Sequence, residues 1–260
     1  MFSETLITEL LKLRRSKVTW FTQGALLMGP LGVALFMWIA MEPGRAAQLG
    51  LLGTKADITG IEATWPSYAL FIVQIVGTGG MLLLAFIVAY VFGREYDDGT
   101  AKNMLALPVE RHWFVIAKLI VAAKWWYQIV LVMLAEAIAI GLLLDLPGYS
   151  AGVVGELTVN VLLAASIAYL LVPVIAWITV WGRGNMAPIG FALGMLLLGN
   201  VIGSTGWAPW FPWSIVPILV GSVGQPVDAL PAGSYVVVAA TFALGVAGTI
   251  WHLRWADNAQ

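Results

Sequence analysis

The sequence predicts an all-α, polytopic membrane protein with six transmembrane helices. Of the 260 residues, 60% are hydrophobic and only 10% are charged, and the mean hydropathy is +0.90. Soluble domains have about 45–50% apolar and about 25% charged residues, so this chain has more apolar surface than a water-facing fold can bury. Six segments approach or exceed the roughly 20 apolar residues of a membrane helix, and an open sheet edge cannot be satisfied in hydrocarbon.

The six spans are expected within a single membrane domain, residues 1–260. We place them at about 20–41, 67–92, 119–144, 157–181, 186–204 and 235–253. Lys118 and Lys124 lie near the start of the third span, and we expect both to extend toward the lipid headgroups.

The distribution of basic residues predicts the orientation. Ten Lys and Arg residues fall in the N-terminal stretch, the second loop, the fourth loop and the C-terminal tail. The opposite loops hold two, Arg45 and Lys55. Because basic loops stay on the cytoplasmic side, we expect a plasma (inner) membrane protein with both termini in the cytoplasm.

The N-terminal stretch has the pattern of an amphipathic interfacial helix. Its apolar positions recur at helical spacing and are Phe2, Leu6, Leu10 and Leu13. Lys12, Arg14 and Arg15 are available for anionic headgroups. The alternative is a basic tail that only sets the topology.

The segment between the fifth and sixth spans is rich in tryptophan and proline. Trp207, Trp210 and Trp213 are three residues apart, and the prolines among them prevent one continuous helix. We expect a broken hairpin that dips into the outer leaflet, or an aromatic belt that only anchors the protein.

Several classes of function are disfavoured. The chain has no cysteine and two histidines, so a metal cluster is not expected. A net charge of −1 gives no sign of nucleic-acid binding. The phosphate-binding pattern G-x-x-x-x-G-K-[ST] does not occur. We therefore expect no enzyme, and no ATP hydrolysis by this chain.

The polar block from Arg94 to Lys118 separates two apolar spans. Asp97 or Asp98 is expected to cap a short helix over Thr100–Leu107, which Pro108 ends. Such a helix, carried by two long spans, is a suitable contact for a soluble partner. The alternative is a simple turn with solvated charges.

The block resembles the loop between the second and third spans of ABC-2 type transporter permeases. The matching pattern is E-Y-x-x-G-T-x-K-N-x-L-A-L-P-V-x-R-x-x-F-x-x-A-K, which runs from Glu95 to Lys118. The start of the chain, Glu9 to Trp20, is similar to the N-terminal elbow helix and first span of that family. Glu110 departs from the usual serine or threonine before the arginine.

The resemblance implies a coupling helix near Asp98–Leu107 that docks on a separate ABC ATPase subunit, which binds ATP and Mg. It also implies a second permease copy or a paralogue, with the cargo path between the two permeases. The expected coupling residues are Glu95, Asp98, Gly99, Thr100, Lys102, Asn103, Leu105, Pro108 and Arg111.

Glu136 is the one acid well inside a span. It is a candidate for cargo or proton contact, or for a hydrogen bond that joins helices. The polar residues considered with it, for a cavity or for packing, are Gln128, Asn160 and Asn200. The glycine pairs 190/194 and 199/203 suit either a dimer contact or packing within one subunit.

These observations predict the permease subunit of an ABC-2 exporter for a hydrophobic or amphipathic compound, such as a drug, a peptide antibiotic or a lipid. The alternative is a non-transporting membrane sensor or scaffold whose loop docks a signalling partner. An intramembrane enzyme is disfavoured, because one buried acid, with no buried histidine and no cysteine, leaves little to build a catalytic group from.

Overall fold

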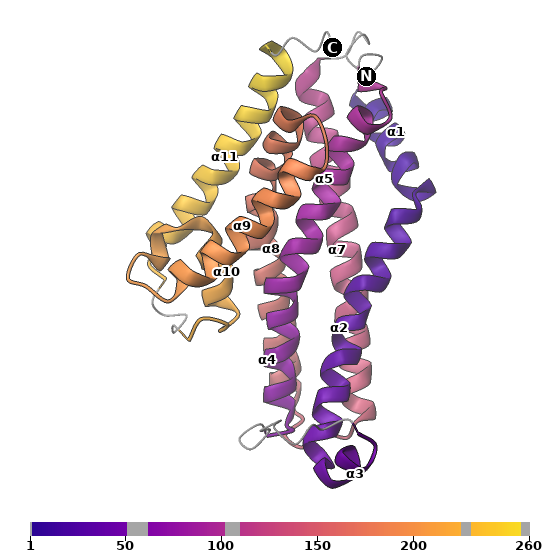
Figure 1. Ribbon diagram of the computed structural model, residues 1–260, viewed down its shortest axis with the longest axis vertical. Helices are drawn as coiled ribbons and strands as arrows, with labels where there is room; N and C mark the ends of the chain where they lie inside the picture. The colour runs from indigo at the N-terminus through magenta and orange to yellow at the C-terminus, as the bar shows by residue number, and fades with distance from the viewer. Residues whose placement is uncertain (1, 51–61, 102–109, 225–229, 256–260) are drawn as a thin grey trace.

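The computed structural model describes residues 2–50, 62–101, 110–224 and 230–255, and every regular element among them is a helix (Figure 1). Six of the helical segments are long and apolar enough to cross a membrane. The predicted all-α architecture and the number of spans are therefore confirmed for this part of the chain. The spans also occur at the predicted places, although several extend further than expected.

The helices follow one another with short connections. The N-terminal part comprises α1 (Phe2–Arg15), α2 (Lys17–Met41) and α3 (Pro43–Gln48). The second span runs over Trp65–Asp97 and consists of α4 (Trp65–Ile75), the π-helix η1 (Val76–Gly80) and α5 (Met81–Asp97). The later elements are α7 (Arg111–Leu143), α8 (Ala151–Gly182), α9 (Met186–Gly203), the 3₁₀ turn η2 (Ala208–Trp210), α10 (Pro212–Leu219) and α11 (Ala232–Trp255).

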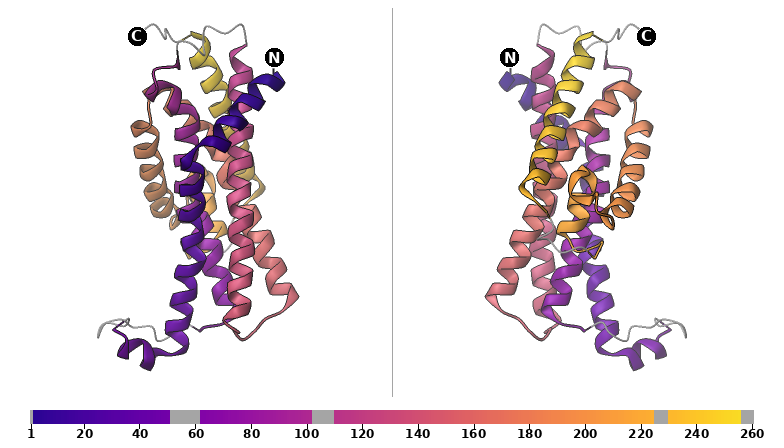
Figure 2. Two further views of the ribbon diagram at one scale, coloured as in Figure 1. Left: turned by 90° about the vertical axis from the view of Figure 1, so that its right-hand side faces the viewer. Right: turned by 90° about the vertical axis from the view of Figure 1, so that its left-hand side faces the viewer.

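The start of α1 and the end of α11, and so both terminal helices, reach the same end of the bundle (Figures 1 and 2). The helices α2, α4, α7 and α8 extend to the opposite end, whereas α9, α10 and α11 cover one side of the half nearer the termini. The central helix is α8, which contacts α4, α5, α7, α9, α10 and α11.

Indole and phenol groups in the core find hydrogen-bond acceptors, as buried polar groups require. Trp126 Nε1 donates to the carbonyl of Ala165 at 3.0 Å. The hydroxyl of Tyr68 donates to the carbonyl of Ala137 at 2.9 Å. Each bond joins α7 to a neighbouring span, so the aromatic side chains fix helix pairs as well as fill space.

The second and third spans continue well into the polar block. We predicted that they would end at residue 92 and begin at residue 119, but α5 runs to Asp97 and α7 begins at Arg111. With 33 residues, α7 is about 50 Å long, which exceeds a hydrocarbon core of about 30 Å. Hydropathy shows only where the apolar residues end. Beyond that point both helices continue through charged residues, and Glu95 on α5 pairs with Lys118 on α7.

The predicted break after the fifth span is confirmed. After α9 the chain makes the 3₁₀ turn and then forms α10, which packs against α9. Trp213 is 8% exposed, whereas Trp207 is 77% exposed. A Cβ on Gly199 would lie 2.4 Å from the carbonyl oxygen of Trp213, so this glycine allows the two helices to approach. Gly199 therefore packs within one subunit, whereas Gly190 and Gly194 face open space.

Candidate functional site

The loop that carries most of the predicted coupling residues begins at the C-terminus of α5. The backbone N–H of Gly99 donates to Tyr96 O at 3.2 Å, and that of Thr100 donates to Glu95 O at 2.9 Å. Gly99 has φ +66°. This is a Schellman arrangement, which satisfies the last carbonyls of a helix and favours glycine in the left-handed region.

The two acids before this loop lie at the end of α5, with Asp97 as its last residue and Asp98 as its C-cap. We predicted that Asp97 or Asp98 would cap the helix that follows; residues 102–109 of that helix lie outside the described residues, so the cap stays a prediction. The Asp97 carboxylate accepts a hydrogen bond from the side-chain amide of Asn185, the residue before α9. Both acids therefore belong to the end of the second span, and Asp97 ties it to the start of the fifth.

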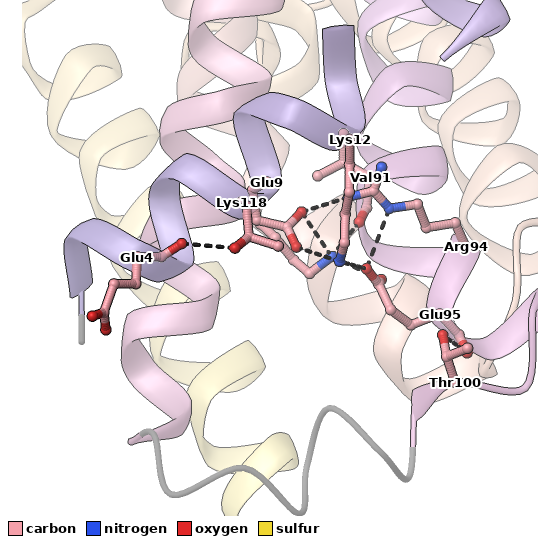
Figure 3. A network of polar contacts seen from close by, with 9 residues as sticks. Glu4, Glu9, Lys12, Val91, Arg94, Glu95, Thr100 and Lys118 are labelled. Carbon is pink, nitrogen blue, oxygen red and sulfur yellow. Dashed lines mark hydrogen bonds and ion pairs between the residues drawn. The ribbon is translucent and has the colours of Figure 1, made fainter. Parts of the chain in front are cut away.

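A cluster of five charged side chains, of which Lys12 is partly exposed, joins α1, α5 and α7 just before this turn (Figure 3). The ammonium of Lys118 lies 2.7 Å from Glu95 Oε2 and 3.5 Å from Glu9 Oε2, and donates to Val91 O at 2.6 Å. Arg94 lies 2.6 Å from Glu9 Oε2 and 3.2 Å from Glu95 Oε1. Lys12 lies 2.7 Å from Glu9 Oε1 and 3.1 Å from Glu95 Oε1.

Each of the two carboxylates in this ion cluster therefore contacts all three cations. Glu9 is 2% exposed, Lys118 is 3% exposed and Glu95 is 4% exposed. Removing one partner of a buried ion pair costs about 3–5 kcal/mol, because the other charge remains buried without compensation. The ion cluster therefore fixes how α1 lies on α5 and α7 at the base of the loop.

The structure differs from the sequence prediction at Lys118, which we expected to extend to the headgroups. It is buried because Glu95, two residues before the end of α5, and Glu9 provide its counter-charges. Glu9 and Lys12 were not predicted as site residues. A signal was present: Glu9 lies on the same face of α1 as Phe2, Leu6 and Leu13, and an acid on an apolar face needs a partner.

The other end of the loop is also anchored. The guanidinium of Arg111, the first residue of α7, donates to the carbonyl of Leu253 and, at 3.3 Å, to that of Arg254. These carbonyls end α11, where a positive charge is favourable. The predicted residues Lys102, Asn103, Leu105 and Pro108 lie outside the described residues. The described predicted residues, Glu95, Asp98, Gly99, Thr100 and Arg111, all belong to the two anchors.

A cavity of about 390 Å³ lies further along the bundle, between α2, α5 and α9. Its walls include Phe21 and Leu26 on α2, Leu82 on α5 and Leu193 on α9. All the lining residues are apolar side chains or glycine, so the cavity suits an apolar group and provides no charge to bind an ion.

Comparison with known proteins identifies the family. The model of the ABC-2 family transporter protein matches residues 5–199. This chain belongs to the ABC-2 family of transporters. It is also similar to the bacitracin transport permease protein BCRB of Bacillus licheniformis, with 28% identity over 194 residues that cover 75% of this chain and 91% of that protein.

Membership makes the chain a multi-pass ABC-2 permease, the membrane subunit that does not itself hydrolyse ATP. ABC permeases work with an ABC ATPase subunit, which binds the ATP. The matched region contains most of α1, the ion cluster, the loop and most of α9. The anchored loop therefore belongs to the part of the chain that the family shares.

The permease does not bring the predicted intramembrane polar residues together. Glu136 is half-buried, and its Oε2 is buried without a hydrogen-bond partner among the described residues. Gln128 is exposed and accepts from Lys124 at 3.0 Å. Asn160 is exposed, and Asn200 donates to Leu196 O on its own helix at 2.9 Å. None of the four lines the apolar cavity.

Proposed function

We propose that this permease exports a hydrophobic or amphipathic compound, of the kind represented by drugs, peptide antibiotics and lipids, with energy from ATP hydrolysed by a separate subunit. The similarity to a bacitracin transport permease supports an antibiotic-like cargo. The apolar cavity between α2, α5 and α9 supports cargo of low polarity, because a charged compound would lose its hydration there without compensation.

The observation that carries this proposal is the anchoring of the loop between α5 and α7 at both ends. The Schellman turn and the ion cluster hold its start on α5, α7 and α1. Arg111 holds its other end on α11. A displacement of segment 102–109 by an ATPase subunit would therefore reach α1, two spans and the C-terminal helix together, which suits a coupling helix at this loop.

The charge distribution supports an orientation with this loop and both termini in the cytoplasm. The end of the bundle that holds the termini also holds most Lys and Arg residues. In this orientation α1 is an elbow helix. It begins beside Trp113, in the first turn of α7, and leads obliquely into the first span (Figure 2).

A second permease copy or a paralogue is part of the proposal. Large apolar side chains on the two helices beside the cavity face outward, with Phe21 on α2 70% exposed and Leu193 on α9 43% exposed. Two copies meeting along this side would enclose the cavity between them. This is where we place the cargo path.

The proposal is tested at Gly99, whose positive φ a proline cannot adopt and whose N–H proline lacks. Gly99→Pro should abolish most ATP-driven efflux from vesicles that contain the permease and its co-purified ATPase, while the permease still inserts into the membrane. Gly99→Asn is the matched control, because asparagine tolerates the left-handed region, and it should retain efflux. The docking assignment is wrong if Gly99→Pro keeps both co-purification and efflux.

A further inference from the structure

A groove separate from the apolar cavity lies on the outside of the bundle, where α1 meets α2 and α7. Its volume is about 410 Å³. Leu10, Leu11 and Leu13 from α1 and the indole of Trp125 from α7 line it. Trp125 is 1% exposed and its Nε1 donates to Thr22 Oγ1 at 3.0 Å. The groove therefore has a fixed apolar wall rather than loose surface side chains.

Two cations border this groove, Arg14 on α1 and Lys124 on α7. Both are exposed, and the groove is lined by no acidic residue. Within the described part of the chain no carboxylate lies within ion-pair distance of either side chain, and Lys124 donates only to Gln128 Oε1. The ion cluster nearby is different, because there Glu9 and Glu95 neutralise most of the positive charge.

The position of the groove along α7 matches the boundary of a bilayer. Lys124 lies 19 residues before Leu143, the last residue of α7, which corresponds to about 28 Å of helix. That length is close to the roughly 30 Å of hydrocarbon in a bilayer. Trp20, which also lines the groove, is 77% exposed, and exposed tryptophan is typical of the membrane interface.

We infer that this groove binds one anionic phospholipid. Its phosphate lies between Arg14 and Lys124, and one acyl chain follows the apolar wall of the groove past Trp20 toward the bilayer interior. The combination of two uncompensated cations with an apolar floor fits this ligand, because neither part alone distinguishes a phospholipid from a soluble anion or from a neutral lipid. A zwitterionic lipid has a cation beside its phosphate, so its head group is attracted less strongly to Arg14 and Lys124.

A bound lipid would contact both α1 and α7 and so stabilise the packing of α1 on the bundle. Arg14 and the ion-cluster residue Glu9 lie on the same 14-residue helix, so lipid and ion pairs restrain one element. This inference concerns lipid binding alone and does not depend on the proposed export function.

Native mass spectrometry of the purified, delipidated permease tests the inference. The protein is titrated with phosphatidylglycerol and, in parallel, with phosphatidylcholine. We expect one phosphatidylglycerol to be retained at concentrations where phosphatidylcholine is not. We expect each of the two cations that contact the lipid phosphate in the groove to contribute about fivefold to retention, so Arg14→Gln with Lys124→Gln should weaken it by about thirtyfold.

A matched pair controls for net charge. Arg15 and Lys17 are exposed neighbours that do not line the groove, and Arg15→Gln with Lys17→Gln should stay within about twofold of wild type. Arg14→Lys with Lys124→Arg keeps both charges and should also bind, provided that all variants elute as one species with equal melting temperatures.

Two results would overturn the site. If both pairs of Gln substitutions weaken retention equally, retention reflects general attraction of anionic lipid to basic residues and not binding in the groove. If inorganic phosphate or glycerol phosphate displaces the lipid at millimolar concentration, the acyl chain contributes nothing and the ligand is a soluble anion.

Discussion

The base of the loop and the apolar cavity are held together in opposite ways. At the loop, three helices meet through ion pairs between two carboxylates and three cations, all from described residues. At the cavity, the walls that α2, α5 and α9 contribute are apolar side chains and glycine. Buried charges allow one arrangement, because any shift leaves a charge without its partner. Apolar surfaces can slide against each other at much lower cost.

The difference indicates where the permease is rigid and where it has freedom to move. The helix α1 and the adjoining ends of α5 and α7 should move as a unit. The cavity lies beside η1, a π-helical segment that interrupts the second span. Such segments are rare within helices and occur frequently at functional sites. A displacement received at the loop would therefore be taken up near the cavity.

The largest effect is expected from Lys118→Met, which tests whether the ion cluster gives this rigidity. Methionine fills a similar volume but leaves Glu9 and Glu95 with two fewer contacts to a cation. We expect a loss of about 3–5 kcal/mol in the free energy of unfolding. The measurement is thermal unfolding in a defined detergent, with limited proteolysis to detect release of α1.

Lys17→Met is the matched control for this change. Lys17 is exposed at the first position of α2, and an exposed lysine contributes little to stability. Equal melting temperatures for the two variants would show that the ion cluster does not fix α1, and the contrast with the cavity would lose its basis.

A smaller effect is expected from Arg111→Glu, which reverses the charge at the second anchor. The carboxylate would face the carbonyl groups of Leu253 and Arg254 instead of donating to them. We expect about 2 kcal/mol of lost stability from the hydrogen bonds and the helix-end charge. Efflux should fall while membrane insertion is retained.

Arg111→Lys keeps the positive charge and separates the two contributions, because lysine provides one compact donor group where arginine provides a fork. It should recover most of the efflux. If Arg111→Glu and wild type transport equally well, α11 is not tied to the loop in the working permease.

The number and place of the spans could be predicted because apolar length is a property of the sequence alone. The ion cluster could not, because its pairs are far apart in the chain: Arg94 lies 85 residues from Glu9 and Lys118 lies 23 from Glu95. The place of Glu9 on the apolar face of α1 indicates that it needs a partner, but only the packing of α1 on α7 shows which residues provide it.

The Trp-rich segment also has tertiary contacts that the sequence does not predict, and here the contacts are apolar. Proline spacing was enough to predict a break, since proline ends a helix by local chemistry. The burial of Trp213 depends on Gly199 and on the close approach of α9 to α10. A sequence pattern gives the local break, whereas the contact partner belongs to the tertiary structure.

The smallest effect on stability, and the most direct test of the cavity, is expected from Gly79→Leu. Gly79 lines the cavity, and a Cβ there would meet no atom within 4 Å. The leucine side chain should therefore fill part of the cavity with less than about 1 kcal/mol of change in the free energy of unfolding. Efflux should decrease several-fold, measured in vesicles with the ATPase subunit present.

Gly77→Leu, on the same π-helical segment, is the packing control. A Cβ on Gly77 would lie 2.5 Å from Val220 Cγ1, so this variant should lose about 1–3 kcal/mol of stability through overpacking. If the cavity is the cargo path, Gly79→Leu reduces efflux at unchanged melting temperature, and Gly77→Leu lowers the melting temperature. If instead Gly79→Leu leaves efflux intact, cargo does not pass this cavity. Movement of its apolar walls would then have a role other than passage of the cargo.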